Sequence, residues 1–377
     1  MKRLAVWMVL VGSGLAAGAA PTSAAITDNS ATYALNMFSD VEGVNVYTQY
    51  IDYAVQTDHQ VTISFQWVHD KIVIPAIDAA PGSPESVDAI TSASRPILDY
   101  NDAFKDFVKI RNSIQGTVSY GGLNGSYYVS SENDYYAQMV SAGYDRAFMD
   151  ENFNLSTGVA YSWDQISPYL QDGTQGSANR NTFHWNLVGT QILTPTTVMR
   201  VGLEYNAVDG QQHDPYRGVY VDGTIAPELH PDRRSRRDVF MKFSQYLGNE
   251  SSLKADFRYY DDSWQVSSQT YGLKLNQRVS RQVTFRYRYR YYTQVPAWFY
   301  RDDYSNTTNV DGFQTADYRL GDYGAHLFGG HITWHPDNLF GSGGWLKHTE
   351  LNFTFERYFN SNNFTANILE TSLRVSF

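Results

Sequence analysis

The sequence predicts an all-β protein: a transmembrane antiparallel up-and-down β-barrel of about 14 strands, with roughly 12 to 16 possible. Three observations support this prediction. Apolar and polar residues alternate through most of the chain, aromatic residues are abundant although the mean hydropathy is low, and the N-terminus has the layout of an export signal. Together they indicate a chain that is exported and then crosses a membrane with strands rather than helices.

The first 25 residues are typical of a secretory signal peptide. Two basic residues open the chain, an uncharged apolar stretch follows, and small residues surround Ala24 and Ala25. Cleavage after either alanine fits this layout. A permanent membrane anchor is the alternative, but the apolar stretch is short for a membrane-spanning helix and rich in glycine. We therefore expect a signal peptide at residues 1–25 and one barrel at residues 26–377.

The composition fits a barrel that crosses a membrane. Mean hydropathy is −0.43, yet 15% of the residues are aromatic, with 29 Tyr, 20 Phe and 8 Trp. Only every second strand residue of a barrel faces lipid, so hydropathy stays low while aromatic girdles raise the aromatic content. Cysteine is absent, which suits an oxidising compartment. The formal charge of −10 argues against a nucleic-acid partner.

The alternation has period two, which is typical of strands with one apolar face. Apolar side chains occupy every second position from Val61 to Trp67 and again from Met199 to Tyr205. No blade-length repeat favours a propeller, and a soluble β-sandwich rarely has so many strands. We predict strands near residues 41–52, 59–68, 113–121, 134–144, 153–163, 182–192, 197–206, 237–246, 252–260, 265–275, 282–292, 323–334, 347–357 and 364–377.

Short and long connections alternate along the chain, as expected for short periplasmic turns and longer outer loops. An even strand number then places both termini in the periplasm. The segment Val68–Asn112 interrupts the pattern, because its four prolines exclude one central strand. Irregular segments of this length are usually functional. Counted back from the C-terminus, this insert belongs to the periplasmic side, unless the strand count is off by one hairpin.

The C-terminus provides a further indication. The chain ends in Phe377 behind alternating apolar residues. This resembles the C-terminal strand signal that the barrel-assembly machinery reads. We therefore expect Phe377 to be an assembly signal and the assembly machinery to be a partner.

The segment Thr284–Tyr291 carries aromatic residues on one face and Arg286, Arg288 and Arg290 on the other. An arginine facing lipid costs about 2–4 kcal/mol near the membrane midplane, so these arginines are expected to line the lumen. The same parity places further charged residues inside: Arg200, Glu204, Lys242, Lys254, Asp256, Arg258, Lys274, Glu350, Glu356, Glu370 and Arg374.

Two interpretations of these lumenal charges remain open. The arginines form a ladder that guides anions through a pore, or they pair with the glutamates and stiffen the barrel. Similar inward numbers of Arg and Glu favour pairing. A selective filter requires an excess of arginines that stay unpaired.

A second basic cluster lies in a long outer loop and the following strand mouth: Arg233, Arg234, Arg236 and Arg237. Guanidinium groups match phosphate geometry, so this cluster is a candidate for binding lipopolysaccharide among the outer-membrane lipids. The commoner use of such a run is a solvated rim that pairs with nearby acids such as Asp232 and Asp238.

Candidates for metal binding and catalysis are weak. His331 and His335 are four residues apart, which on a strand means about 13 Å, too far for one ion. No G-x-S-x-G elbow is present. We expect no metal, no cofactor and no catalytic residue.

Residues 87–94, 231–236, 258–264 and 291–300 resemble recurring motifs of the bacterial family domain of unknown function 3570. The resemblance implies an outer-membrane barrel, often encoded near periplasmic redox or cofactor-attachment proteins, and no agreed activity. We therefore expect a channel or export protein for a small polar or anionic solute in the bacterial outer membrane. The alternatives are a non-conducting accessory barrel that serves a periplasmic maturation partner through residues 68–112, and an outer-membrane enzyme.

Overall fold

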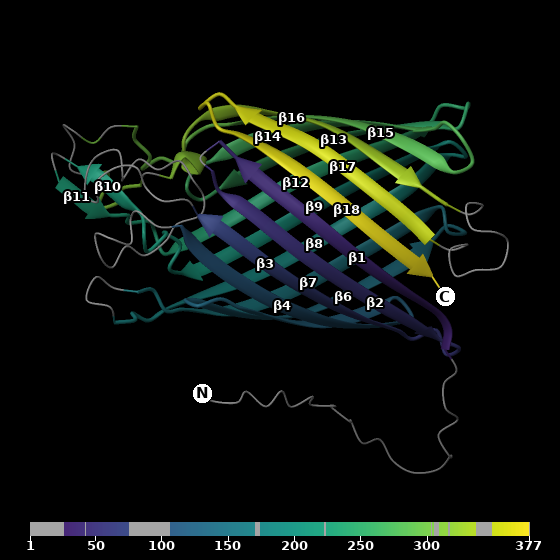
Figure 1. The fold of residues 1–377 in the computed structure, drawn as a ribbon, viewed down its shortest axis with the longest axis horizontal. Helices are drawn as coiled ribbons and strands as arrows, with labels where there is room; N and C mark the ends of the chain where they lie inside the picture. Colours follow the sequence, from purple (N-terminus) through teal and green to yellow (C-terminus); the bar gives the residue numbers. More distant parts are fainter. Residues whose placement is uncertain are drawn as a thin grey trace, which may run out of the picture.

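A computed structural model shows a closed antiparallel barrel of 16 strands (Figure 1). The predicted fold class is confirmed, and the count exceeds the expected 14 by two strands, within the predicted range. The structure describes residues 26–41, 43–74, 106–169, 174–221, 224–302, 304, 309–315, 317–336 and 349–376. Within these ranges, no helix is long and apolar enough to cross a membrane. The predicted signal peptide and Phe377 lie outside the described residues.

Each barrel strand pairs with its neighbours along the chain, and β1 pairs with β18 to close the barrel. The barrel strands are β1 (Ile26–Asp40), β2 (Asn45–Thr57), β3 (Thr62–Ile74), β4 (Phe107–Tyr120), β5 (Leu123–Ser131), β6 (Tyr135–Phe148), β7 (Phe153–Ile166), β8 (Ala178–Thr194), β9 (Thr197–Gly210), β12 (Arg233–Tyr246), β13 (Ser251–Asp262), β14 (Ser267–Arg278), β15 (Val283–Gln294), β16 (Tyr323–Trp334), β17 (Thr349–Asn360) and β18 (Thr365–Ser376). A separate hairpin, β10 (Gly218–Val221) and β11 (Thr224–Pro227), and a short 3-10 helix, η2 (Tyr318–Leu320), lie in the connections.

Two strands, β1 and β5, are missing from the sequence prediction. The hairpin between β4 and β5 turns on Gly121 and Gly122, which have φ of 58° and 85°. Two adjacent positive φ values are what a two-residue type I′ turn needs, so the chain reverses with almost no loop. The sequence therefore offers no long polar break to separate the two strands. β1 begins directly after the predicted cleavage sites and opens with polar residues that hide its alternation.

The additional strand β5 changes the parity from which Val68–Asn112 was expected on the periplasmic side. β3 extends to Ile74 and β4 starts at Phe107, so both flanks of the predicted insert belong to strands. Residues 75–105 lie outside the described residues. The strand ends that bear this connection lie at the barrel end opposite the termini, where the β9–β12 and β15–β16 connections also lie (Figure 1). When strands are counted from the C-terminus, omitting one strand reverses the membrane side expected for every connection that is N-terminal to it.

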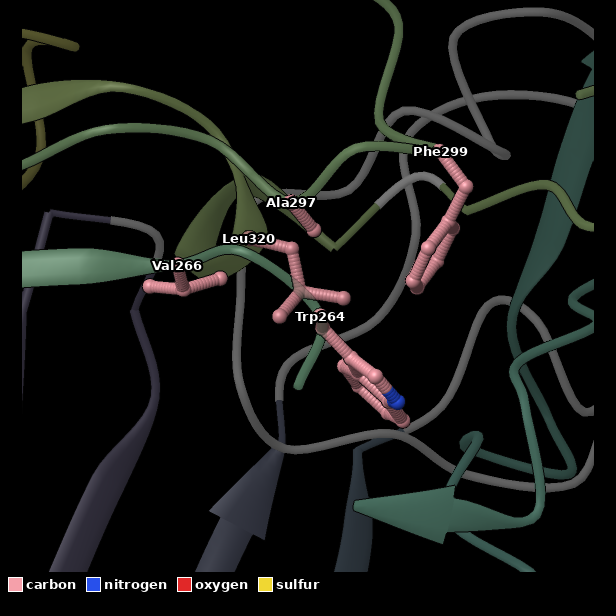
Figure 2. Close-up of a cluster of buried hydrophobic side chains, with 5 residues drawn as sticks. All are labelled: Trp264, Val266, Ala297, Phe299 and Leu320. Carbon is pink, nitrogen blue, oxygen red and sulfur yellow. The ribbon is translucent and has the colours of Figure 1, made fainter. Parts of the chain in front are cut away.

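The two faces of the strands differ as predicted from the alternation. On β17, Phe353 and Phe355 are 48% and 53% exposed on the outside. The intervening Thr354 accepts or donates a hydrogen bond with His331 of β16 on the inside, at 2.8 Å. One cluster of Trp264, Val266, Ala297, Phe299 and Leu320 packs at the end of the barrel that carries the long connections (Figure 2).

Candidate functional site

The basic side chains predicted to face inward gather on one wall of the barrel, formed by β9 and β12–β15, which is called the basic wall below. The strand register places Lys254, Lys274 and Arg288 directly opposite one another on β13, β14 and β15. Arg200 of β9 likewise faces Lys242 of β12. Like charges on neighbouring strands destabilise a sheet unless water or an anion lies between them. The arrangement is therefore costly if it serves structure alone.

A cavity of 720 Å³ lies against this wall. Because its lining comes from six consecutive barrel strands, β8, β9 and β12–β15, it is a region of the lumen rather than a surface dent. Nine of the predicted lumenal residues line it: Arg200, Glu204, Lys242, Lys254, Asp256, Arg258, Lys274, Arg288 and Arg290.

Of the basic residues predicted to face inward on this wall, Arg258 and Arg288 form ion pairs within the described part of the chain. Arg258 lies 2.7 Å from Glu204 and 2.6 Å from Asp238. Arg288 lies 2.6 Å from Glu356 of β17, across β16. In the described part of the chain, six others lack an acidic partner within ion-pair distance: Arg200, Lys242, Lys254, Lys274, Arg286 and Arg290. The lumen thus contains both paired arginines and the excess of basic residues without acidic partners that a selective filter requires.

The remaining predicted acids form a separate group on β17 and β18. Glu350 accepts a hydrogen bond from Asn352 at 2.7 Å and faces Arg374 in the register. Glu370 faces Thr354, next to His331, which interacts electrostatically with both glutamates. These acids therefore do not neutralise the basic wall, with the exception of Glu356.

The opposite wall, formed by β2–β6, has a different character. Its inward side chains at mid-height are mainly neutral and polar. Gln66 donates to the hydroxyl of Tyr50 at 2.9 Å, and Ser126 and Ser141 share a hydrogen bond of 2.7 Å. The lumen is therefore electrostatically asymmetric, positive on one side and neutral on the other.

A second region of interest lies at the end of the lumen that carries the long connections, called the mouth below. The connection after β9 reaches across the mouth, where the Tyr216 hydroxyl donates to the Asp134 carboxylate beside β6. The backbone N–H of Tyr169 also donates to this hydroxyl, at 3.2 Å. Burial and the hydrogen bond to Asp134 raise the pKa of Tyr216, so its proton stays in place at all working pH values. A cavity of 670 Å³ lies at this crossing.

The charges at the mouth are paired, unlike those of the basic wall. Lys109 lies 3.0 Å from Glu132 and 3.3 Å from Asp134. Arg111 binds Asp70 at 2.5 Å, and Arg180 of β8 binds Asp164 at 3.1 Å. The sequence prediction did not select these residues, because it started the strand of Lys109 and Arg111 at residue 113. Extending the same parity backwards along that strand would have found them.

The predicted outer basic cluster, Arg233, Arg234, Arg236 and Arg237, lies on β12, and the alternation of the strand places its members on two different faces. Arg234 lies on the inner side, pairs with Asp262 and stacks 4.1 Å above the Trp264 ring. Arg236 shares its parity, whereas Arg233 and Arg237 are exposed on the outer side. The expected acidic partner Asp238 is instead bound to Arg258 inside the lumen. The four arginines therefore do not form one phosphate-binding patch.

A buried histidine belongs to the packed loops at the mouth. The His230 ring lies 5.4 Å from Trp264 and 5.5 Å from Phe299, and 3.8 Å separates it from the Glu228 carboxylate. Burial lowers the pKa of His230 to about 4, so the ring is neutral near pH 7. Among the described residues, no group of three or more His, Asp or Glu side chains is arranged to hold a metal ion.

Comparisons with known proteins give a family and a fold. The family Protein of unknown function (DUF3570) matches residues 7–368. A search among proteins of curated function found no match. Similar solved structures include a loop L8 deletion mutant of OmpT, an outer membrane protein of Vibrio cholerae, with TM-score 0.48, 8% identity and coverage of 93% of this chain and 98% of that one. A BenF-like porin from Pseudomonas fluorescens Pf-5 has TM-score 0.44, 11% identity and coverage of 93% and 98%.

Proposed function

The chain belongs to the family Protein of unknown function (DUF3570), and we propose that it is an outer-membrane channel for a small anionic solute. The closed barrel supports the membrane location, because every barrel strand has two paired neighbours and the barrel leaves no open sheet edge in contact with lipid. Its exposed apolar and aromatic side chains match the outer surface of a membrane barrel. The predicted signal peptide supports export.

The unpaired basic wall is the observation that carries the proposal. Six inward-facing lysines and arginines have no acidic partner within ion-pair distance among the described residues, and five of them line the lumenal cavity, while the opposite wall is mainly neutral. Positive side chains along a water-filled path raise the local concentration of anions and exclude cations. Placing like charges on adjacent strands costs stability, and binding of a passing anion offsets this cost.

Planar-bilayer recording tests this function directly. In a gradient of potassium chloride, the reversal potential of the wild-type chain should show a preference for chloride over potassium. Replacing three unpaired residues, in the variant Lys274→Gln, Arg286→Gln and Arg290→Gln, should lower that preference while the barrel folds normally. Arg357→Gln is the matched control, since Arg357 lies on the outer face of β17 and bonds to Asn367.

The paired arginine gives the opposite expectation and separates the two roles. Arg288→Gln leaves Glu356 without its partner in a partly buried position. We expect it to lower the free energy of unfolding by about 1–3 kcal/mol. A wild-type barrel that folds but does not conduct, or that prefers cations, would refute the anion channel.

We favour the channel over the alternative of an accessory barrel. It relied on residues 68–112 reaching a periplasmic partner. Their flanking strands β3 and β4 instead meet at the barrel end opposite the termini. The packed loops of Figure 2 lie at that same end.

A further inference from the structure

One carboxylate lies within the basic wall itself. Asp256 of β13 faces Lys242 of β12 and Gly272 of β14 in the register. Arg290 of β15 follows on the far side of Gly272. Lys254 has the same parity as Asp256 on β13 and lies two positions away. The four charged side chains all line the lumenal cavity of 720 Å³, so Asp256 is an acid placed among basic residues in the lumen.

The Asp256 carboxylate occupies the place that a side chain at position 272 would take. A Cβ atom on Gly272 would collide with both carboxylate oxygens. Asp256 interacts electrostatically with Lys274. Among the described residues, however, it takes part in no ion pair and its side chain accepts no hydrogen bond. The glycine thus gives the carboxylate room beside the cavity, where its oxygens can accept hydrogen bonds from a ligand.

Neutralisation of the basic wall does not explain this position. An acid that offsets a neighbouring charge forms a direct ion pair, as Glu356 does with Arg288 at 2.6 Å. Asp256 has Lys242 directly opposite and Lys254 two positions away, yet the described structure pairs it with neither. An ionised carboxylate accepts hydrogen bonds and donates none. Asp256 therefore favours a ligand that brings its own proton.

The surrounding charges determine which ligand can supply that proton. The cavity is lined by five basic residues that have no acidic partner within ion-pair distance in the described part of the chain: Arg200, Lys242, Lys254, Lys274 and Arg290. These cations repel an ammonium group and attract anions. A fully deprotonated oxyanion such as sulfate would meet the Asp256 carboxylate with like charge and no hydrogen to share. An oxyanion that keeps a proton near neutral pH can bond to the cations and also donate its hydroxyl to Asp256.

We infer that Asp256 and the basic residues around it form a binding site for inorganic phosphate, a compact oxyanion that keeps at least one proton near neutral pH. Lys242, Lys274 and Arg290 would bond to its charged oxygens, and Asp256 would accept the hydrogen bond of its P–OH group. Gly272 is a positioning residue, because its missing side chain leaves the carboxylate its place. This inference rests on the proposed function for entry of the ligand into the lumen, and it names the solute class of the channel.

Binding is measured apart from transport to test the inference. Isothermal titration of the detergent-solubilised full chain at about pH 8 compares sodium phosphate with sodium sulfate, since phosphate is then mainly a dianion and differs from sulfate chiefly by its proton. Phosphate should bind roughly tenfold or more tightly, as expected for one hydrogen bond to a charged group. Glycolate combines a hydroxyl with a single carboxylate and should bind more weakly than phosphate.

Three variants distinguish a proton acceptor from a negative charge alone. Asp256→Asn should reduce the preference for phosphate over sulfate to less than about threefold, because an amide accepts from phosphate but also donates to sulfate. Gly272→Ala should reduce this preference without changing any charge, because the new Cβ atom displaces the carboxylate. Asp52→Asn makes the same charge change on the inner face of β2 in the opposite wall, and it should leave the preference unaltered.

The contrary outcomes are distinct. Equal binding of phosphate and sulfate, binding of neither, or a preference that either Asp256→Asn or Gly272→Ala keeps would overturn the phosphate site. Glycolate binding as tight as phosphate binding would also overturn it, because a hydroxyl and one charge would then suffice. An anion-selective current without preferential phosphate binding would leave the channel standing and remove this site. Preferential phosphate binding without any current would do the reverse.

Discussion

At the scale of single residues, the neighbours on the adjacent strands determine whether a charged side chain in the lumen forms an ion pair. Arg288 and Arg290 share one face of β15 and are two positions apart. Arg288 reaches Glu356 because its neighbour on β16 is Gly329, whose missing side chain leaves room for the pair. Arg290 faces Leu327 on that strand and has no acid to bind. The two arginines look identical in the sequence but differ in their contacts.

His230 gives a prediction about pH at the same scale. Its pKa in the folded loops is about 4, below the ordinary value of 6.5, so the folded form binds fewer protons than the unfolded form. Stability of the packed loops should therefore fall as the pH drops from about 6.5 to about 4, by up to ~3 kcal/mol. Limited proteolysis of the outer loops measures the effect, by comparison of about pH 7.5, above this range, with about pH 4.5, near its lower end.

The surrounding charged groups require a control for this pH dependence. His230 lies near Glu228, Asp317, His213 and Arg217. Burial raises the pKa of Asp317, but the hydrogen bonds and charge of Arg319 and the charge of Arg217 together lower it further, so the net shift is downward and protonation of Asp317 removes stability at still lower pH. His230→Phe should remove the sensitivity above about pH 4.5 and keep the rest. Unchanged acid sensitivity in this variant would show that another group is responsible.

At the scale of elements, the connection between β9 and β12 restricts the mouth. Its Tyr216 bonds to Asp134, 82 residues away in the chain. Tyr216→Phe keeps the ring but removes this bond, so the crossing should open more often. We expect larger and noisier single-channel currents, with about 1–2 kcal/mol less energy holding the loop. Tyr220→Phe in β10 is the control, because Tyr220 is exposed; equal noise in both variants would argue against a latch.

The hairpin of β4 and β5 determines which side of the membrane the connection after β3 faces. That connection should lie at the outer end. Barrels of this kind have their short turns in the periplasm, and with an even number of strands both termini lie there as well. The chain has no native cysteine, so a single introduced one is a clean probe. Ser83→Cys should react with a membrane-impermeant thiol reagent in intact cells. Arg281→Cys, in the short turn between β14 and β15, should resist it; the opposite labelling pattern would invert the topology.

At the scale of the whole molecule, closure depends on the first and last strands. β1 and β18 pair from Ser30 opposite Ser376 to Asp40 opposite Ala366. Phe377 follows this last strand directly, and it remains our predicted signal for the assembly machinery. Deleting Phe377 should reduce the heat-modifiable folded form in the outer membrane. Normal amounts of folded barrel in the deletion strain would show that the assembly machinery recognises another feature. Phe377→Tyr should assemble normally if the machinery recognises an aromatic ring.

The net charge of the whole molecule says little about its lumen. The chain carries a formal charge of −10, yet one wall of the lumen collects unpaired lysines and arginines. The strand register determines the electrostatic potential inside the barrel, because it decides which charged side chains share the cavity. The net charge, in contrast, sums charges that lie on different surfaces.

The sequence by itself determined the fold class and the direction of most side chains. Period-two alternation allows only one arrangement in lipid, because a register shifted by one residue would place Arg286 and its neighbours in the membrane. The alternation could not reveal β5, because the two-glycine turn at Gly121 and Gly122 leaves no visible break between strands. This one omission reversed the expected membrane side of the connection after β3.

Only the tertiary structure decided which lumenal charges are paired and where the aromatic residues gather. Arg288 meets Glu356, 68 residues away in the chain, and ring contacts among Tyr292, Tyr318 and Tyr323 join β15, η2 and β16. Such contacts depend on the stagger between strands and on the path of the loops. Alternation fixes the face of each side chain but not its neighbour across the barrel, because it is a local property of one strand, while pairing across strands is set by closure of the whole barrel.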